Sequence, residues 1–117
     1  MLFLEYPKCS TCRKAKQWLD EHGIQYTDRH IVENPPTAEE LAEWLQRSGK
    51  PIGRFMNTSG QKYRALGLAQ KKAEMSEQEL LELLATDGML VKRPLLVLDN
   101  DVLPGFRQEE WETALLK

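Results

Sequence analysis

The sequence lacks the features that mark membrane, exported and nucleic-acid-binding proteins. No apolar run approaches the ~20 residues that a membrane-spanning helix needs, so we expect no association with a membrane. The first residues lack the charged segment and the long apolar segment of a secretory signal, so we expect a cytoplasmic protein. A net charge of −2 and a pI near 5.7 argue against direct binding to DNA or RNA, which requires basic surfaces.

Cysteine and histidine are also scarce, with two of each in 117 residues: Cys9, Cys12, His22 and His30. Zinc takes four ligands at characteristic spacings, which the two histidines do not provide, so we predict no metal, and nothing indicates another cofactor. A structural disulfide between Cys9 and Cys12 would close a loop of one helical turn and constrain the unfolded chain little. Two inert thiols packed in the core are the other alternative to a redox role.

The length and composition predict a single domain over residues 1–117. Hydrophobic residues make up 41% of the chain and charged residues 29%, which is typical of globular proteins. A chain of 117 residues can bury one substantial hydrophobic core. No linker or low-complexity tract divides it.

The two cysteines form a Cys-x-x-Cys motif between a predicted strand and a predicted helix. Residues 1–6 are largely apolar, as in a buried strand. Apolar side chains at Ala15, Trp18 and Leu19 have the spacing of one helix face, which predicts a helix over residues 11–21. A Cys-x-x-Cys at such a junction is typical of thioredoxin-like redox proteins.

This position predicts different tasks for the two thiols. Cys9 would lie at the helix N-terminus, where unpaired N–H groups and the helix dipole stabilise a thiolate. Because the thiolate is the reactive form, we predict that Cys9 is the nucleophile, with Lys8 as a candidate for further stabilisation of its charge. Cys12, about one turn later, can attack a mixed disulfide on Cys9 and release the product. In a reducing cytoplasm such a motif is more often catalytic than structural.

The remaining patterns predict strands on both sides of a helical block at about residues 37–86. Periodicity and turn residues predict, in chain order, a strand at 24–31, a helix at 38–48, short helices and turns at 51–72, a helix from 77, strands at 95–98 and 102–103, and a helix at 108–116. Capping boxes precede the two longer helices of the block, beginning at Thr37 and Ser76. The order β-α-β, helical block, β-β-α predicts an α/β fold with helices covering a four-stranded sheet.

Six short segments occur in a specific order along nearly the whole chain. They are Cys9-Ser10-Thr11-Cys12-Arg13-Lys14-Ala15, Glu33-Asn34-Pro35-Pro36-Thr37, Asn57-Thr58-Ser59-Gly60, Tyr63-Arg64-Ala65-Leu66-Gly67-Leu68, Lys92-Arg93-Pro94-Leu95 and Gly105-Phe106-Arg107. Together they resemble the arsenate reductase/Spx (ArsC-like) family. The resemblance implies a thioredoxin-like fold of the glutaredoxin type, with a four-stranded mixed sheet and the block at about 37–86 as a helical insertion. It also implies a cis proline at Pro94 that faces the active site.

The resemblance implies a set of site residues as well. In arsenate reductases of this family the nucleophilic cysteine falls at Cys9, and three arginines hold the oxyanion. Two arginine positions match Arg93 and Arg107, while the third falls near Asn57. The neutral amide of asparagine cannot fully replace the bidentate, charged contacts of a guanidinium. Cys12 is a second departure, because these reductases usually lack a cysteine there.

The implied activity is that of a thiol–disulfide oxidoreductase, with Cys9 as nucleophile and Cys12 as resolving thiol. It would reduce an oxyanion such as arsenate, or a disulfide. Glutaredoxin, glutathione or thioredoxin would supply the electrons. Cys12 makes an external thiol less necessary for resolving the adduct on Cys9.

A second interpretation comes from the other branch of the same family. Spx-like transcription regulators share the Cys-x-x-Cys and the Arg-Pro dipeptide, and they bind the RNA polymerase α subunit without catalysis. Their binding surface lies in the insertion and includes a glycine, which Gly53 would approximate here. A turn or helix-start role also explains Gly53, so the enzyme and the regulator both stay open.

Overall fold

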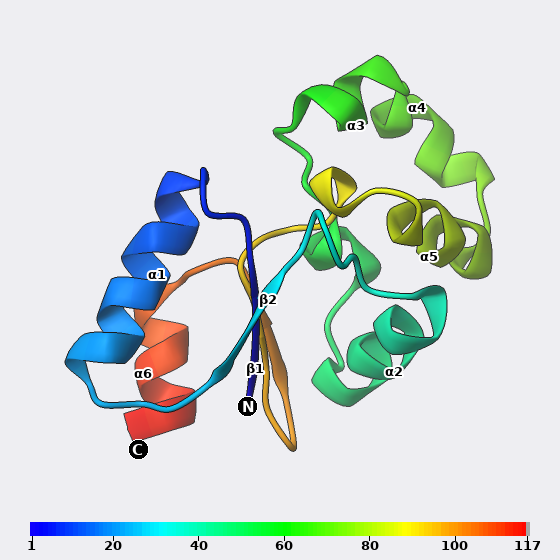
Figure 1. Cartoon of the computed structure of the whole chain (residues 1–117). Coiled ribbons are helices and arrows are strands. Elements are labelled where there is room, and N and C mark those ends of the chain that lie inside the picture. Colours follow the sequence, from blue (N-terminus) through cyan, green and yellow to red (C-terminus); the bar gives the residue numbers. More distant parts are fainter. Residues whose placement is uncertain (117) are drawn as a thin grey trace.

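A mixed four-stranded sheet forms the centre of the protein, whose computed structural model describes residues 1–116 (Figure 1). The strands are β1 (Leu2–Glu5), β2 (Thr27–His30), β3 (Leu95–Val97) and β4 (Val102–Pro104). Their order in the sheet is β2-β1-β3-β4. β1 pairs parallel with β2 and antiparallel with β3, and β3 pairs antiparallel with β4. The predicted α/β fold with a four-stranded mixed sheet is therefore confirmed.

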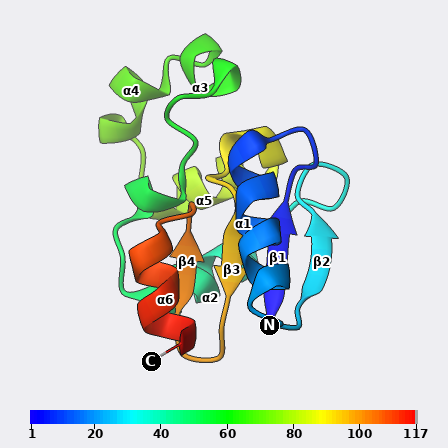
Figure 2. The ribbon, with the colours of Figure 1, turned by 90° about the vertical axis from the view of Figure 1, so that its left-hand side faces the viewer.

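Two helices cover one face of the sheet, α1 (Ser10–Glu21) and α6 (Gln108–Leu116), and Figure 2 shows them side by side in front of the strands. Alternation along the strands explains this packing, because successive side chains point to opposite faces. Phe3, Leu96 and Leu103 share a buried core with the fully buried Trp111 of α6. No helix within residues 1–116 is long and apolar enough to cross a lipid bilayer.

The other face of the sheet is covered by the segment between β2 and β3. Its elements are α2 (Ala38–Ser48), η1 (Ile52–Phe55), α3 (Gln61–Ala65), α4 (Leu68–Lys71), η2 (Lys72–Glu74), α5 (Glu77–Ala85) and η3 (Gly88–Leu90). The two predicted capping boxes are present, with Thr37 and Ser76 as the N-caps of α2 and α5. Leu4 and Leu95 of the sheet share a buried core with Leu41, Leu84 and other side chains of this segment.

A partly buried ion pair between β2 and α2 fixes the start of this helical segment against the sheet. Arg29 of β2 donates to both carboxylate oxygens of Glu40 in α2, over 2.8 and 2.9 Å. It also donates to the carbonyls of Asn34 and Pro35 in the intervening loop, both at 2.9 Å. The Arg29 guanidinium holds the pKa of Glu40 below its usual range. Bidentate contacts of this kind are geometrically specific, so they set where α2 begins relative to β2.

Three predicted strands are longer than the strands in the structure, the first by one residue at each end, since 1–6 was predicted and β1 spans Leu2–Glu5. The predicted strand 24–31 is reduced to Thr27–His30 because its one neighbour in the sheet, β1, offers only four residues for pairing. The predicted strand 95–98 ends at Val97, since the N–H of Leu98 donates 2.9 Å to the carbonyl of Asp101 and begins the hairpin turn. The predicted helices at 38–48 and 108–116 have the same bounds in the structure.

The strand register brings three chain segments to one end of the sheet. Leu4 pairs with Leu95, and Leu95 pairs with Pro104. Continuing the antiparallel register places Tyr6 level with Arg93, and the Arg93 guanidinium carbon lies 5.5 Å from the centre of the Tyr6 ring. The segment after β1, the segment before β3 and the segment after β4 therefore meet at the same end.

Gly88 holds the helical segment close to the sheet. It is buried, and a Cβ at this position would lie 2.0 Å from the carbonyl oxygen of Ile31, which directly follows β2. Any side chain here must displace backbone, because Ile31 itself is fully buried. Glycine therefore permits direct contact between η3 and the end of β2.

We predict that Gly88→Ala lowers the free energy of unfolding by about 1–3 kcal/mol, as overpacking of a tight interior does. Gly53→Ala is the matched control, because no atom lies within 4 Å of a Cβ built there, and it should change stability by less than about 0.5 kcal/mol. Urea unfolding of both variants measures the difference. Equal stability of the two variants would contradict the close contact at Gly88.

Candidate active site

Cys9 occupies the N-cap position of α1. Its backbone is extended, with φ −88° and ψ 121°, and its sulfur accepts a hydrogen bond from the backbone N–H of Cys12 over 3.4 Å. The Cys9 side chain is partly exposed, whereas Cys12 is fully buried beneath it. No disulfide joins them. One sulfur thus faces solvent at the positive end of a helix, and the second lies one turn inside.

The surroundings shift the acidity of the two thiols in opposite directions. Burial raises the pKa of Cys9, but hydrogen bonds from the N–H and S–H of Cys12 and the charge of Arg93 outweigh burial and hold this pKa below its ordinary value. Burial raises the pKa of Cys12 to about 12, and the adjoining Cys9 sulfur adds to the rise. Cys9 is therefore the thiol that ionises first.

A cavity of about 510 Å³ opens beside the Cys9 sulfur. Fourteen residues line it: Cys9, Thr11, Gly53, Arg54, Met56, Asn57, Thr58, Ser59, Lys92, Arg93, Pro104, Gly105, Phe106 and Arg107. They come from the start of α1, from η1 and the segment after it, and from the two ends of the β3–β4 hairpin. This volume lies in the range of cavities that hold small organic molecules.

Two contacts fix the Arg93 side chain, and the backbone that follows it is held as well. Its Nη1 donates to the carbonyl of Met89 over 3.4 Å, and its guanidinium lies over the Tyr6 ring. The peptide bond to Pro94 is cis, as the resemblance implied, and the Pro94 carbonyl accepts from the N–H of Gly105 over 2.7 Å. The buried Nε of Arg93 has no hydrogen-bond partner within residues 1–116. Native proteins seldom leave a buried donor unpaired, so this N–H lacks a partner that the described chain does not supply.

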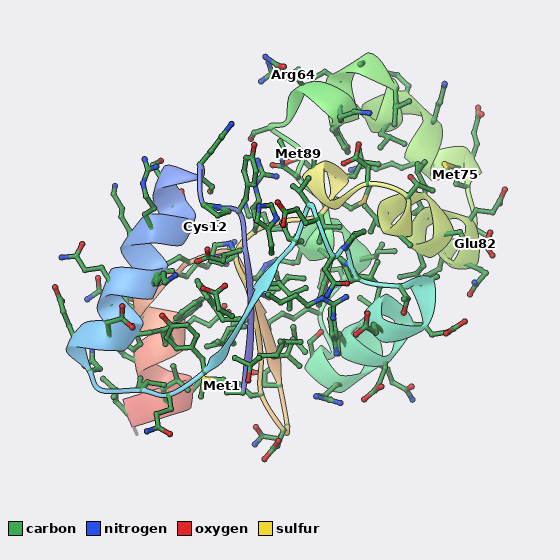
Figure 3. The ribbon with its side chains drawn as sticks, in the orientation of Figure 1. Met1, Cys12, Arg64, Met75, Glu82 and Met89 are labelled. Atoms are coloured by element: carbon green, nitrogen blue, oxygen red, sulfur yellow. The ribbon has the colours of Figure 1, made fainter. Side chains whose placement is uncertain are left out.

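Asn57 reaches the cavity through a short pairing between residues 55–57 and 90–92. The N–H of Lys92 donates to Phe55, Met56 pairs with Val91, and the N–H of Asn57 donates 2.8 Å to Leu90. This pairing carries the segment after η1 alongside the segment before β3. The Asn57 amide donates 3.1 Å to the Met89 carbonyl, the same oxygen that Arg93 contacts. Figure 3 labels Met89 in the segment between α5 and β3, and Cys12 in the first turn of α1.

The model of the ArsC family matches residues 4–114 of this sequence. The chain belongs to the ArsC family. Among curated ArsC-like relatives, the uncharacterized protein YusI of Bacillus subtilis is 52% identical over 96% of this chain and 95% of YusI. The regulatory protein MgsR of the same organism is 36% identical over 94% of this chain and 86% of MgsR.

Solved structures agree with this membership. An ArsC-family-related protein from Bacteroides fragilis superposes with a TM-score of 0.93 and 55% identity, covering 96% of this chain and 94% of that one. A possible arsenate reductase from Streptococcus mutans superposes with a TM-score of 0.86 and 48% identity, covering 95% and 96%. Similarity over nearly the whole chain confirms the thioredoxin-like fold expected of an ArsC-family member.

Four residues predicted for the site of this ArsC-family chain line the cavity together: Cys9, Asn57, Arg93 and Arg107. Cys12 lies below Cys9, out of the cavity, and Pro94 is buried directly behind Arg93. Lys8 is exposed and lies outside the cavity lining. Within residues 1–116, no group of three or more histidine, cysteine or acidic side chains is arranged to hold a metal ion.

Two cations that line the cavity were absent from the predicted site, Arg54 and Lys92. Lys92 belongs to the Lys92-Arg93-Pro94-Leu95 segment, but no pattern in the sequence indicates that its side chain points toward the thiol. Arg54 follows Gly53 in a segment of mixed pattern. The pairing of residues 55–57 with 90–92, which carries Arg54 to the cavity, joins segments more than thirty residues apart and leaves no local signal.

The lowered pKa of Cys9 predicts how its reactivity depends on pH. Between this pKa and that of free cysteine, Cys9 is a thiolate while a free thiol is still protonated. The rate of alkylation by iodoacetamide should therefore level off at a lower pH for Cys9 than for free cysteine in the same buffer, and fall once pH drops through the Cys9 pKa. Coinciding profiles would show that the helix N-terminus and Arg93 do not activate this sulfur.

Arg93→Gln tests the source of this activation. Loss of the charge should raise the Cys9 pKa and slow alkylation at pH 7 by roughly three- to tenfold, the effect of one unit charge a few ångströms away. Lys14→Gln, an exposed change on α1 outside the cavity, is the control and should leave the rate unchanged. If the pH profile of Arg93→Gln superimposes on the wild-type profile, Arg93 does not lower the Cys9 pKa.

Proposed function

We propose that this ArsC-family chain is a thiol–disulfide oxidoreductase in which Cys9 is the nucleophile and Cys12 the resolving thiol. The observation that supports it most directly is the pair of opposed acidities one helical turn apart: a partly exposed sulfur of lowered pKa and a buried thiol with a pKa of about 12. Such a pair separates attack on the substrate from release of the product.

In the first step the Cys9 thiolate attacks the acceptor. With a disulfide, a Cys9–substrate disulfide forms and one substrate thiolate leaves. With arsenate, a sulfur–arsenic bond forms and the arsenate loses one oxygen as water. Arg93 and Arg107 line the cavity and would hold negative charge beside the reacting sulfur.

In the second step the Cys12 sulfur attacks Cys9. This forms the Cys9–Cys12 disulfide and releases either the second substrate thiolate or arsenite, so two electrons pass from the two thiols to the acceptor. The leaving group takes up the proton of Cys12. The high pKa of Cys12 is due first to burial and then to the adjoining Cys9 sulfur. Once Cys9 carries the adduct, its negative charge is gone, and Cys12 loses a proton more readily.

The acceptor and the electron donor follow from the same chemistry. An oxyanion such as arsenate, or a disulfide, can take the two electrons, and the cations around the cavity suit an acceptor with negative charge. Glutaredoxin, glutathione or thioredoxin would return the Cys9–Cys12 disulfide to thiols. In the reducing cytoplasm that we propose for this chain, these donors are present.

Parallel turnover assays with arsenate and with a glutathione mixed disulfide, each coupled to glutaredoxin and to thioredoxin, test the proposal. Cys9→Ser should abolish turnover. Cys12→Ser should still undergo the first attack and accumulate an adduct on Cys9 that intact-mass spectrometry detects. Full turnover by Cys9→Ser, or no turnover with any acceptor, would contradict the assignment as a thiol–disulfide oxidoreductase.

One observation favours a second function, that of a redox-switched regulator. Gly53 is exposed, has open space around it and has no left-handed backbone, so nothing in the described chain requires glycine there. A partner that approaches closely would require it, as an insertion glycine does in Spx-like regulators. The similarity to the regulatory protein MgsR supports the same interpretation. The partner would be the RNA polymerase α subunit.

Binding to the α subunit, and its dependence on Gly53, separates the two functions, with Gly53→Arg as the test variant. For a regulator, purified α subunit should bind the wild-type chain, and the substitution should abolish binding while the fold stays intact, because the site is open. For an enzyme, wild-type chain should show no binding to the α subunit. Circular dichroism of the variant provides the folding control.

A further inference from the structure

The cavity beside Cys9 is lined by four cationic side chains: Arg54, Lys92, Arg93 and Arg107. No carboxylate among residues 1–116 lines it. The chain as a whole carries a net charge of −2, so this local excess of positive charge is not a property of the general surface. Converging cations in a partly enclosed site attract anions more strongly than the same charges spread over an open surface.

Arg54 is held at the cavity by one edge of its guanidinium. Its Nη2 donates to the carbonyl of Pro104 over 3.4 Å and to the carboxylate of Glu110 over 3.3 Å. Both partners approach the same nitrogen, and both contacts are long. A guanidinium carries five N–H donors on three nitrogens. Because both contacts use Nη2, the donors on Nε and Nη1 have no partner within residues 1–116. Glu110 and Pro104 thus orient Arg54 without using up its capacity for a ligand.

Asn57 cannot take the part of the missing arginine. Its amide is neutral and already donates to the Met89 carbonyl. Arg54, three positions earlier, lines the same cavity with a full charge. The pairing of residues 55–57 with 90–92 carries both side chains to the cavity, so a cation reaches it from a position that the family's arginine pattern does not include.

We propose that Arg54 is the third guanidinium of the anion site and determines its specificity for anionic acceptors, together with Arg93 and Arg107. This proposal rests on the proposed function, because it assumes that Cys9 meets its acceptor in this cavity. Arg54 is a binding residue that acts on the acceptor rather than on the thiol, since Arg93, and not Arg54, is among the groups that shift the Cys9 pKa. Glu110 is the positioning residue that holds it.

Paired alkylation of Cys9 with anionic iodoacetate and neutral iodoacetamide tests this assignment at pH 7. Peptide mapping by mass spectrometry restricts the measurement to Cys9. In Arg54→Gln the iodoacetate rate should fall by roughly three- to tenfold, as expected for loss of one nearby charge, while the iodoacetamide rate stays unchanged. In Glu110→Gln the amide oxygen can still accept the hydrogen bond that positions Arg54, but the opposing charge is gone, so the ratio of the iodoacetate rate to the iodoacetamide rate should rise.

Arg64→Gln is the matched control. Arg64 is exposed on α3, lies outside the cavity and points away from the sheet in Figure 3, so its loss should leave the ratio unchanged. Phosphate, an oxyanion that a thiol does not reduce, added at constant ionic strength should slow iodoacetate alkylation of the wild-type chain and have less effect on Arg54→Gln.

The outcomes separate the two proposals. An unchanged ratio in Arg54→Gln, or an equal fall in Arg64→Gln, would overturn the assignment of Arg54 while Cys9 remains a reactive nucleophile. A Cys9 that reacts with neither reagent would instead overturn the proposed function, and with it this assignment.

Discussion

The antiparallel register between β1 and β3 is the constraint on which the site depends. Because Leu4 pairs with Leu95, the chain leaves β1 toward Cys9 at the point where Arg93 and the cis Pro94 enter β3. A shift of one residue would turn every side chain of β1 to the opposite face, so burial on both faces of the sheet enforces this register. The contact of Arg93 with the Tyr6 ring follows directly from it.

The helical segment between β2 and β3 supplies the other wall of the cavity. It is tied to the sheet at its start by Arg29 and Glu40 and near its end by the contact of Gly88 with Ile31. Between these ties, the pairing of residues 55–57 with 90–92 directs η1 toward the thiol. The chain segments at the end of the sheet therefore provide the nucleophile and its activating charge, whereas this helical segment contributes six of the fourteen residues that line the cavity.

Much of this arrangement could be predicted from the sequence, for reasons that differ between the parts. The start of α1 and the capping boxes at Thr37 and Ser76 were predictable because helix starts are determined by neighbouring residues. The length of β2 was not, because pairing with β1 limits it. Arg54 was not predicted for the same kind of reason: its place at the cavity depends on pairing between distant segments. Resemblance to the ArsC-like family supplied Arg93 and Arg107, which no local pattern marks.

One environment lowers the pKa of Cys9 and raises the pKa of Cys12, and the proposed division of tasks between the two thiols depends on this difference. A titration of the chain labelled with ¹³C at both cysteine Cβ atoms, followed by NMR, measures the two groups separately in the same molecule. The structure predicts that the Cys9 signal titrates below the ordinary range of a thiol, while the Cys12 signal stays that of a protonated thiol until the pH nears about 12. Titration of Cys12 before Cys9, or of both in the ordinary range, would contradict this difference.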